Sequence, residues 1–301
     1  MMKIVLAAQA AVLLVLAVVA ADLYAHKRVE MVAGVNVWGY RGQVARLRSV
    51  GDLRVLMVGG TRAYGYGAPA DGTIAHAVEW DLKADTARPL TVINAAQMGA
   101  TAADFPAIVS RYLPLNPDIV CIYDDLGRAQ TRRRESPVAR AAYGYTPVLP
   151  LVLEEKGMAL RFGTVAAGYA GTPVTASWPR RIAGASLQSI GASLRFLGSE
   201  VVASEPHDYA ASMLAAADVA LASVRHLLLV VDPPVDGRTA DNLAELQAAI
   251  ARRADPRLSL LTLDNVGTPD TLLDGYSYNA VGRSRVATAI RLQLLKLPVK
   301  N

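Results

Sequence analysis

The sequence predicts an α/β fold: a three-layer α/β/α sandwich with a mostly parallel sheet, preceded by one N-terminal transmembrane helix. Three observations carry this prediction. Short apolar runs alternate along the chain with segments of helical spacing. The run over residues 118–123 is of the continuous apolar kind that is buried in parallel sheets. Residues 4–21 are apolar apart from Gln9.

The N-terminal apolar run is at the threshold for crossing a bilayer, which takes about 18–20 residues at a rise of about 1.5 Å each. A cleaved signal peptide is the alternative, because Val19-Ala-Ala21 resembles a cleavage site. The run exceeds the usual signal-peptide core of about 7–15 residues, which favours a retained anchor over residues 1–25. Lys3 precedes the run and the pair Lys27-Arg28 follows it, so the two favour opposite orientations of the helix in the membrane. Charge therefore does not decide the orientation. Under either interpretation the bulk of the chain lies outside the cytoplasm.

Beyond the anchor, the pattern predicts a lead-in segment over 26–51 and a main domain over 52–301. The expected strands are 54–58, 90–94, 118–123, 226–232 and 258–263, and the expected helices are 61–82, 102–113, 209–224, 239–253 and 284–295. Such alternation implies right-handed crossovers and a parallel sheet. The Pro- and Gly-punctuated stretch 129–205 interrupts this order. We interpret it as an inserted helical or loop region that covers one end of the sheet.

The charge pattern bears on partners. The net charge of +5 and pI near 9.3 come without interleaved aromatic and basic residues, so nucleic acid is not an expected partner. Part of the excess sits in one cluster, Arg132, Arg133 and Arg134. The cluster is either a solvated surface or a docking point for anionic lipid or an acidic protein.

Metal and cofactor sites are not expected. Cys121 is the single cysteine and lies in an apolar run, so it is interpreted as a buried structural thiol. Asp124 and Asp125 follow a predicted strand, but adjacent side chains on an extended chain point apart. Helix capping or turn formation is therefore the expected role of these two carboxylates rather than a metal or acid/base pair.

One turn draws attention as a candidate site. An apolar run from Val55 ends in two glycines, Thr61 follows at once, and helical spacing comes next. This order predicts a strand, a tight turn and a helix start. It displays a hydroxyl residue at the carboxyl end of a strand, where open α/β sheets bind ligands.

Five segments, in this order, carry a resemblance to a known family: Asn36-Val-Trp-Gly-Tyr-Arg-Gly42, Val58-Gly-Gly-Thr61 with Tyr64-Gly-Tyr-Gly67, Val92-Ile-Asn-Ala-Ala-Gln-Met-Gly99, Pro117-Asp-Ile-Val-Cys-Ile-Tyr-Asp124, and Asp274-Gly-Tyr-Ser-Tyr-Asn-Ala-Val-Gly282. Over roughly residues 36–295 the chain resembles the SGNH or GDSL-type hydrolases, particularly membrane-anchored bacterial members. The resemblance implies an SGNH-hydrolase-like sandwich. It also implies a single-pass protein of the bacterial inner membrane with its main domain in the periplasm.

The resemblance also assigns site positions. In that family a nucleophilic Ser, an oxyanion-hole Gly, an oxyanion-hole Asn and an Asp-x-x-His pair carry out catalysis. The corresponding positions here are Thr61 for the nucleophile, Gly99 for the oxyanion Gly, Gly127 for the Asn, Asp274 for the Asp and Ser277 for the His. Gly127 has no side-chain donor, and Ser277 does not titrate near neutral pH.

These departures predict a large loss of catalysis. A hydroxyl is a poor nucleophile unless an adjacent base accepts its proton. Removing the base from a comparable triad costs on the order of 10⁶-fold in kcat, and removing one oxyanion donor costs about 10²–10³-fold. Of the four histidines, His76 is too far along its helix, His226 is at the opposite edge of the sheet, and His26 adjoins the anchor. His207, in a loop, stays open as a substitute base.

Two functions follow from these residues. The first is a catalytically inactive SGNH-like domain that acts as a structural or accessory subunit of a membrane-associated complex, with protein partners and no cofactor. The second is an esterase or O-acyl transferase that acts on cell-surface glycans or lipids with Thr61 as a non-standard nucleophile. The identities of Thr61 and Ser277 separate the two.

Overall fold

The computed structural model describes residues 2–29, 35–36, 38–65, 68–86, 88–97, 99–124, 132–134, 148–169, 173–174, 176–195, 200–202, 208–233, 240–264, 266–272 and 277–298. Its centre is a five-stranded sheet of order β2-β1-β3-β6-β7, in which every neighbouring pair is parallel. The strands are β1 Leu53–Gly59, β2 Leu90–Asn94, β3 Ile119–Asp124, β6 His226–Val231 and β7 Leu258–Thr262. All five were predicted, each to within one residue at either end.

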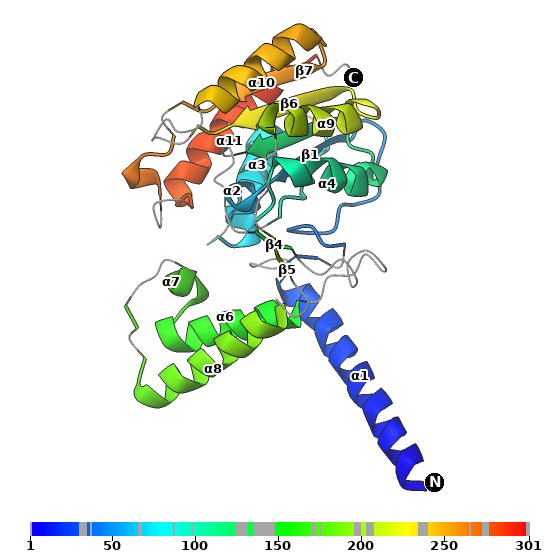
Figure 1. Cartoon of the computed structure of the whole chain (residues 1–301), viewed down its shortest axis with the longest axis vertical. Helices are drawn as coiled ribbons and strands as arrows, with labels where there is room; N and C mark the ends of the chain where they lie inside the picture. Colours follow the sequence, from blue (N-terminus) through cyan, green and yellow to red (C-terminus); the bar gives the residue numbers. More distant parts are fainter. Residues whose placement is uncertain are drawn as a thin grey trace.

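Helices cover both faces of the sheet, which confirms the predicted α/β/α sandwich (Figure 1). One face packs against α4 (Phe105–Tyr112), α9 (Tyr209–Leu221) and α10 (Ala240–Arg253). The other face packs against α3 (Ile74–Asp85) and α11 (Ala280–Leu294). Alternate residues of each strand enter the two cores, as in Leu56 and Met57 of β1. A strand that is apolar on both faces gives the continuous run seen in the sequence.

The helix predicted over 61–82 is two helices, which corrects the sequence interpretation. The short α2 (Thr61–Tyr64) ends at Gly65, whose φ of 80° is left-handed. A 3₁₀ turn, η1 (Ala70–Gly72), precedes α3, and the Thr73 hydroxyl caps α3 by accepting from the His76 N–H. Left-handed backbone at Gly65 stops α2 after one turn. Further 3₁₀ turns are η2 (Ala102–Asp104), η3 (Leu113–Leu115) and η4 (Pro269–Thr271).

The lead-in segment holds the turn at α2 in place. The buried guanidinium of Arg41 donates through Nη1 to the carbonyls of Tyr64 (2.6 Å) and Gly65 (2.8 Å). It also lies 4.4 Å from the ring centroid of Tyr64. The Arg41 N–H bonds the carbonyl of Asn94, at the end of the edge strand β2. The lead-in therefore ties the first turn after β1 to the neighbouring strand.

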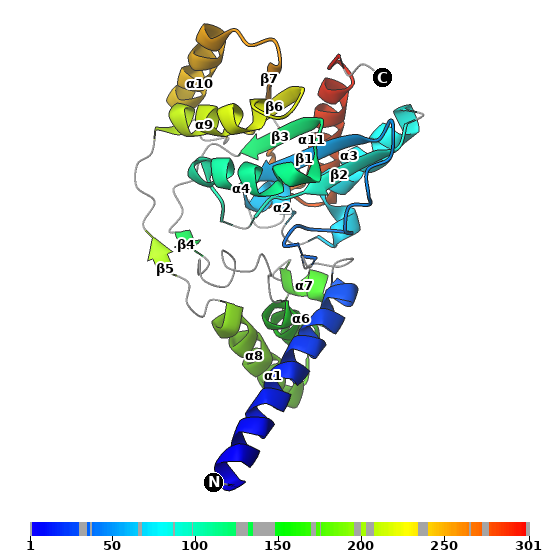
Figure 2. The same ribbon diagram turned by 90° about the vertical axis from the view of Figure 1, so that its right-hand side faces the viewer.

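The N-terminal helix α1 (Met2–Val29) contains the stretch Val5–Ala25, which is long and apolar enough to cross a membrane, with a mean hydropathy of 2.3. Beside it, α6 (Leu149–Phe162) and α8 (Trp178–Arg195) pack against each other, and α7 (Val165–Tyr169) adjoins α6. In both views α6 and α8 lie between the sheet domain and the N-terminus of α1 (Figures 1 and 2).

The stretch 129–205, which interrupts the predicted order of strands and helices, contains α6, α7 and α8. Backbone contact joins α6 and α8, because a Cβ at Gly157 would lie 2.4 Å from the Gly184 carbonyl and one at Gly191 would lie 2.4 Å from the Pro150 carbonyl. We call α6 and α8 the hairpin. A small two-stranded sheet, β4 (Arg132–Arg134) with β5 (Glu200–Val202), contains the arginine cluster.

Candidate functional site

The strand order places a topological switch point beside the turn that the sequence singled out. The chain leaves β1 toward β2 on one side and returns to β3 on the other. Loops that run in opposite directions from neighbouring parallel strands leave an opening at the carboxyl ends, which is where open α/β sheets bind ligands. Thr61 lies here, as the first residue of α2 two positions after the end of β1, and Asp124 ends β3.

Two glycines shape the turn by close approach. A Cβ at Gly59 would lie 2.4 Å from the carbonyl oxygen of Tyr123, and one at Gly60 would lie 2.7 Å from that of Ala100. The half-buried Thr61 accepts a hydrogen bond at Oγ1 from the Gly99 N–H, at 3.0 Å. Gly99 has a φ of 73°, the left-handed conformation that glycine favours. The structure therefore brings together two of the five predicted site positions, Thr61 and Gly99.

The remaining predicted positions are only partly described. Ser277 is buried between η4 and α11. Gly127 and Asp274 lie outside the described residues, as do Asp125 and the open candidate His207. His226 is the first residue of β6, at the amino edge of the sheet as predicted, and His76 is exposed on α3.

A buried carboxylate network adjoins Thr61. Asp232 follows β6 and is 1% exposed. Its Oδ2 accepts three hydrogen bonds: from Arg62 Nη1 at 2.7 Å, from the Tyr123 hydroxyl at 2.6 Å and from the Tyr278 hydroxyl at 2.5 Å. The Arg62 guanidinium also lies 4.9 Å from the Tyr278 ring centroid. The network joins the carboxyl ends of β1, β3 and β6 to Tyr278, the residue that follows Ser277.

Burial governs the electrostatics of this network. Burial, and then the negative charge of Asp232, raises the pKa of Tyr123 well above its usual value and also raises the pKa of Tyr278. Both phenols thus stay protonated and donate to the carboxylate. Arg62 supplies the opposing positive charge, and its side chain is only 9% exposed. An ion pair with this many charge-assisted hydrogen bonds is well compensated for its loss of water.

The two raised tyrosine pKa values give a testable prediction. The chain has 12 tyrosines, and we expect Tyr123 and Tyr278 to resist ionisation above pH of about 10, the ordinary tyrosine pKa. Above pH of about 10 the folded state then holds protons that the unfolded state releases, so the stability contributed by these tyrosines is present below that pH and falls as the pH rises above it. Phenolate absorbance during an alkaline titration measures this. Tyr123→Phe and Tyr278→Phe should each remove one late-titrating group, and a single transition of all tyrosines in the folded protein would contradict the assignment.

The described contacts of Thr61 do not activate its hydroxyl. A nucleophilic hydroxyl needs a neighbouring acceptor for its proton. The Gly99 amide is a donor, and it occupies a lone pair of Oγ1 without taking the proton. Among the described residues, no histidine or carboxylate is hydrogen-bonded to Thr61 Oγ1, and no group of three or more His, Cys, Asp or Glu side chains could hold a metal ion.

The sequence interpretation missed Arg62, Tyr123, Asp232 and Tyr278. Asp232 is an acidic residue that directly follows an apolar strand and precedes two prolines, the same signal that marked Asp124. Arg62 directly follows the displayed Thr61. The sequence could have marked Arg62 and Asp232 as candidate site residues, but it could not have shown that the two are paired. The expected burial of Cys121 is confirmed, and burial raises the pKa of its thiol to about 12.

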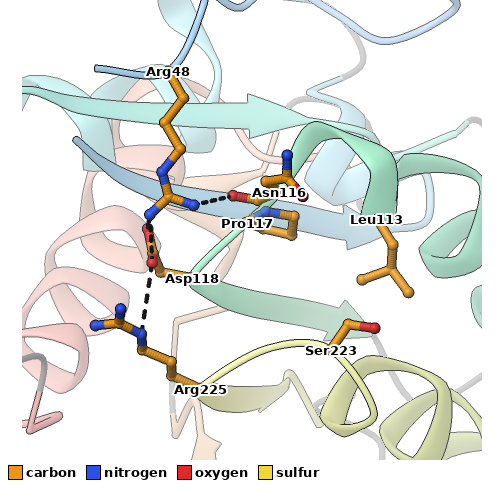
Figure 3. Close-up of a pocket in the computed structure, with 7 residues that line it drawn as sticks. All are labelled: Arg48, Leu113, Asn116, Pro117, Asp118, Ser223 and Arg225. Atoms are coloured by element: carbon orange, nitrogen blue, oxygen red, sulfur yellow. Dashed lines mark hydrogen bonds and ion pairs between the residues drawn. The ribbon is translucent and has the colours of Figure 1, made fainter. Parts of the chain in front are cut away.

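A pocket of about 210 Å³ lies at the other end of the sheet, where β3 and β6 begin (Figure 3). In it Arg48 Nη2 contacts both oxygens of Asp118, at 2.7 and 2.8 Å, and Arg225 Nε lies 3.9 Å from the same carboxylate. Asp118 also accepts the Arg54 N–H at 3.0 Å. This carboxylate joins the lead-in segment to the starts of β1 and β3, so the pocket is a structural junction remote from Thr61.

Comparison with known proteins gives structural matches. No protein-family profile matches the chain, and no curated protein matches it. It is similar to a carbohydrate esterase whose active site displays divergent catalytic and non-catalytic binding functions, with 9% identity and a TM-score of 0.44 over 85% of this chain and 68% of that one.

Two further solved structures are similar. A protein of the G-D-S-L family from Desulfitobacterium hafniense DCB-2 has 11% identity and a TM-score of 0.43, over 79% of this chain and 98% of that one. A family two carbohydrate esterase from Clostridium thermocellum, in complex with cellohexaose, has 10% identity and a TM-score of 0.41, over 84% of this chain and 66% of that one.

Proposed function

We propose that this protein is a membrane-anchored, non-hydrolytic SGNH-like domain that serves as a structural or accessory subunit of a membrane-associated complex. The observation that carries the proposal is that the chain's own groups are bonded to one another beside Thr61. Arg62, next to the nucleophile position, is paired with the buried Asp232, and the Thr61 hydroxyl is bonded to an amide donor.

The buried network supports a structural role for this end of the sheet. A catalytic crevice has to admit a substrate beside the nucleophile, with donors directed at the developing oxyanion. Here the side chain after Thr61 points to Asp232 and contacts Tyr278, and the Gly99 amide is already bonded to the Thr61 hydroxyl. A substrate carbonyl would have to displace that bond and would still lack a base at Ser277.

The proposed location is the bacterial inner membrane, with α1 inserted as a single span and the sheet domain in the periplasm. The length and mean hydropathy of Val5–Ala25 support the span. Protein partners in the same membrane would pack around α1. Docking of Arg132, Arg133 and Arg134 on anionic lipid or an acidic protein stays a prediction.

The first test is enzymatic. The full-length protein in detergent is expected to show no turnover of short-chain p-nitrophenyl esters above a Thr61→Ala control, because loss of the general base costs on the order of 10⁶-fold in kcat. Turnover that disappears in Thr61→Ala would contradict the proposal. It would support the second function, an esterase or O-acyl transferase for cell-surface glycans or lipids.

The paired variant Thr61→Ser with Ser277→His tests the positional assignment. Gain of esterase activity in this variant, but not in either single variant, would support the assignment of both positions.

The accessory role has a separate test. Native membranes solubilised in mild detergent are expected to yield the protein in an assembly larger than its own 31.9 kDa. Migration as a free monomer would contradict the accessory role and leave the enzymatic result standing.

A further inference from the structure

The outer face of α8 carries a row of large apolar side chains that are exposed in the part of the chain that the structure describes. Trp178 is 71% exposed, Ile182 48%, Ile190 50% and Leu194 46%. At about 100° per residue these four positions fall within an arc of roughly 160°. We call them the α8 stripe. The glycines that contact α6, Gly184 and Gly191, lie on the opposite side of the helix.

The charged residues of α8 are at its two ends. Arg180 and Arg181 are exposed in its first turn, and the next charged residue is Arg195, the last of the helix. The two acidic residues of α6, Glu154 and Glu155, are buried. A helix with an apolar face, a tryptophan and flanking arginines has the composition of an interfacial helix, which lies in the plane of a bilayer with its apolar face about 5–10 Å deep. Each arginine near an anionic surface adds electrostatic attraction.

The hairpin is fixed to the candidate membrane span. Near the end of that span, the buried carboxylate of Asp22 accepts the N–H groups of Val148 (2.9 Å) and Leu149 (2.7 Å) at the start of α6. Ala25 and Val148 form a small apolar core beside this contact. A carboxylate on the first amides of a helix is a favourable cap. It holds α6 at the level where α1 would leave the bilayer.

The arrangement of the elements favours lipid as the occupant of the stripe. Both views show α6 and α8 on the side of the sheet domain from which α1 extends, level with the C-terminal half of α1 (Figures 1 and 2). If α1 crosses the bilayer, α8 lies at the depth of the leaflet from which α1 emerges. Apolar area beside a span meets acyl chains there without needing a second protein.

We propose that the α8 stripe docks on the outer lipid leaflet around α1, so that the hairpin and the span together fix the sheet domain above the membrane. This inference rests on the proposed insertion of α1. The occupant is a bilayer surface that contains anionic lipid. The apolar side chains contact its acyl region, and the two arginines contact its headgroups; the residues are Trp178, Ile182, Ile190 and Leu194, with Arg180 and Arg181.

Tryptophan fluorescence tests this with a matched control. The chain has three tryptophans, and Trp80 on α3 of the sheet domain has the same 71% exposure as Trp178. Two full-length variants each retain one of them: Trp38→Phe with Trp80→Phe, and Trp38→Phe with Trp178→Phe. Both are reconstituted in vesicles of phosphatidylcholine and phosphatidylglycerol with brominated acyl chains. We expect roughly twofold quenching of Trp178, since the face of an interfacial helix reaches the acyl boundary. Trp80 fluorescence should not change.

The outcomes separate this inference from the anchoring on which it rests. Failure of the protein to float with vesicles would refute the insertion of α1. Flotation with equal, weak quenching of both tryptophans would overturn the docking of the stripe. Trp178 that is shielded from an aqueous quencher in native membranes, yet unquenched by brominated lipid, would assign the stripe to a protein partner and also overturn it. Ile190→Glu should reduce the quenching of Trp178 while the protein still floats.

Discussion

Replacing Asp232 with alanine is expected to lower the free energy of unfolding by about 3–5 kcal/mol, the usual result of removing one partner of a buried ion pair. The change leaves the Arg62 charge in a nearly buried site and removes the acceptor of both the Tyr123 and the Tyr278 hydroxyls. For a domain of this size the melting temperature should fall by roughly 6–20 °C. Thermal unfolding of the full-length protein in detergent, followed by circular dichroism, measures it.

A surface pair supplies the control for Asp232. Asp218 contacts Arg253 at 2.5 Å, but its side chain is 66% exposed. Asp218→Ala should therefore change stability by no more than about 1 kcal/mol. The apolar pair Arg62→Met with Asp232→Leu should be less destabilising than Asp232→Ala, because it removes both charges of the buried pair together. If Asp232→Ala has the same melting temperature as the wild-type protein, the network does not stabilise this end of the sheet. The structural interpretation of this end of the sheet then loses its main support.

Most of the sheet could be predicted because its signals are local. A parallel strand that is covered on both faces has to be apolar at successive positions, as at Ile119 to Ile122 of β3, so the strand is visible as a continuous run. The break between α2 and α3 was missed because it depends on one residue, Gly65, which takes a left-handed conformation. A helical pattern on both sides of such a residue reads as a single helix.

The site was predictable only where its residues lie in motifs. Thr61 and Gly99 belong to segments with a recognisable order, and the structure joins them. The contact between Arg62 and Asp232 spans 170 positions and exists only after β1 and β6 have been placed on either side of β3. No local pattern encodes a pairing of that kind. The hairpin is similar: Gly184 and Gly191 suggest a close helix contact, but their partner α6 is identified only by the fold.

The second large effect is expected at Gly59, which packs the turn whether or not the protein is an enzyme. A Cβ at this position would lie 2.4 Å from the Tyr123 carbonyl oxygen and 2.6 Å from the Ala63 Cβ. Since β1 pairs with β3 at Gly59 and Tyr123, the added methyl forces the two central strands apart or displaces α2. Overpacking of this kind costs about 1–3 kcal/mol and sometimes more. Gly59→Ala should therefore lower the melting temperature measurably.

Gly72→Ala is the matched control, because its nearest neighbours, the Pro69 ring carbons, would be 3.3 Å and 3.4 Å from the new Cβ. We expect a smaller loss of stability there, since a shift of the Pro69 ring by a few tenths of an ångström relieves these contacts and alanine also restricts the unfolded chain. Gly59 and Thr61 belong to the same Gly-Gly-Thr turn. Comparing Gly59→Ala with Thr61→Ala therefore distinguishes two reasons for this turn, packing and chemistry. A turn kept for packing is disrupted by Gly59→Ala and tolerates Thr61→Ala, whereas a turn kept for chemistry loses an activity in Thr61→Ala at unchanged stability. Equal melting of Gly59→Ala and wild-type protein would exclude the packing explanation.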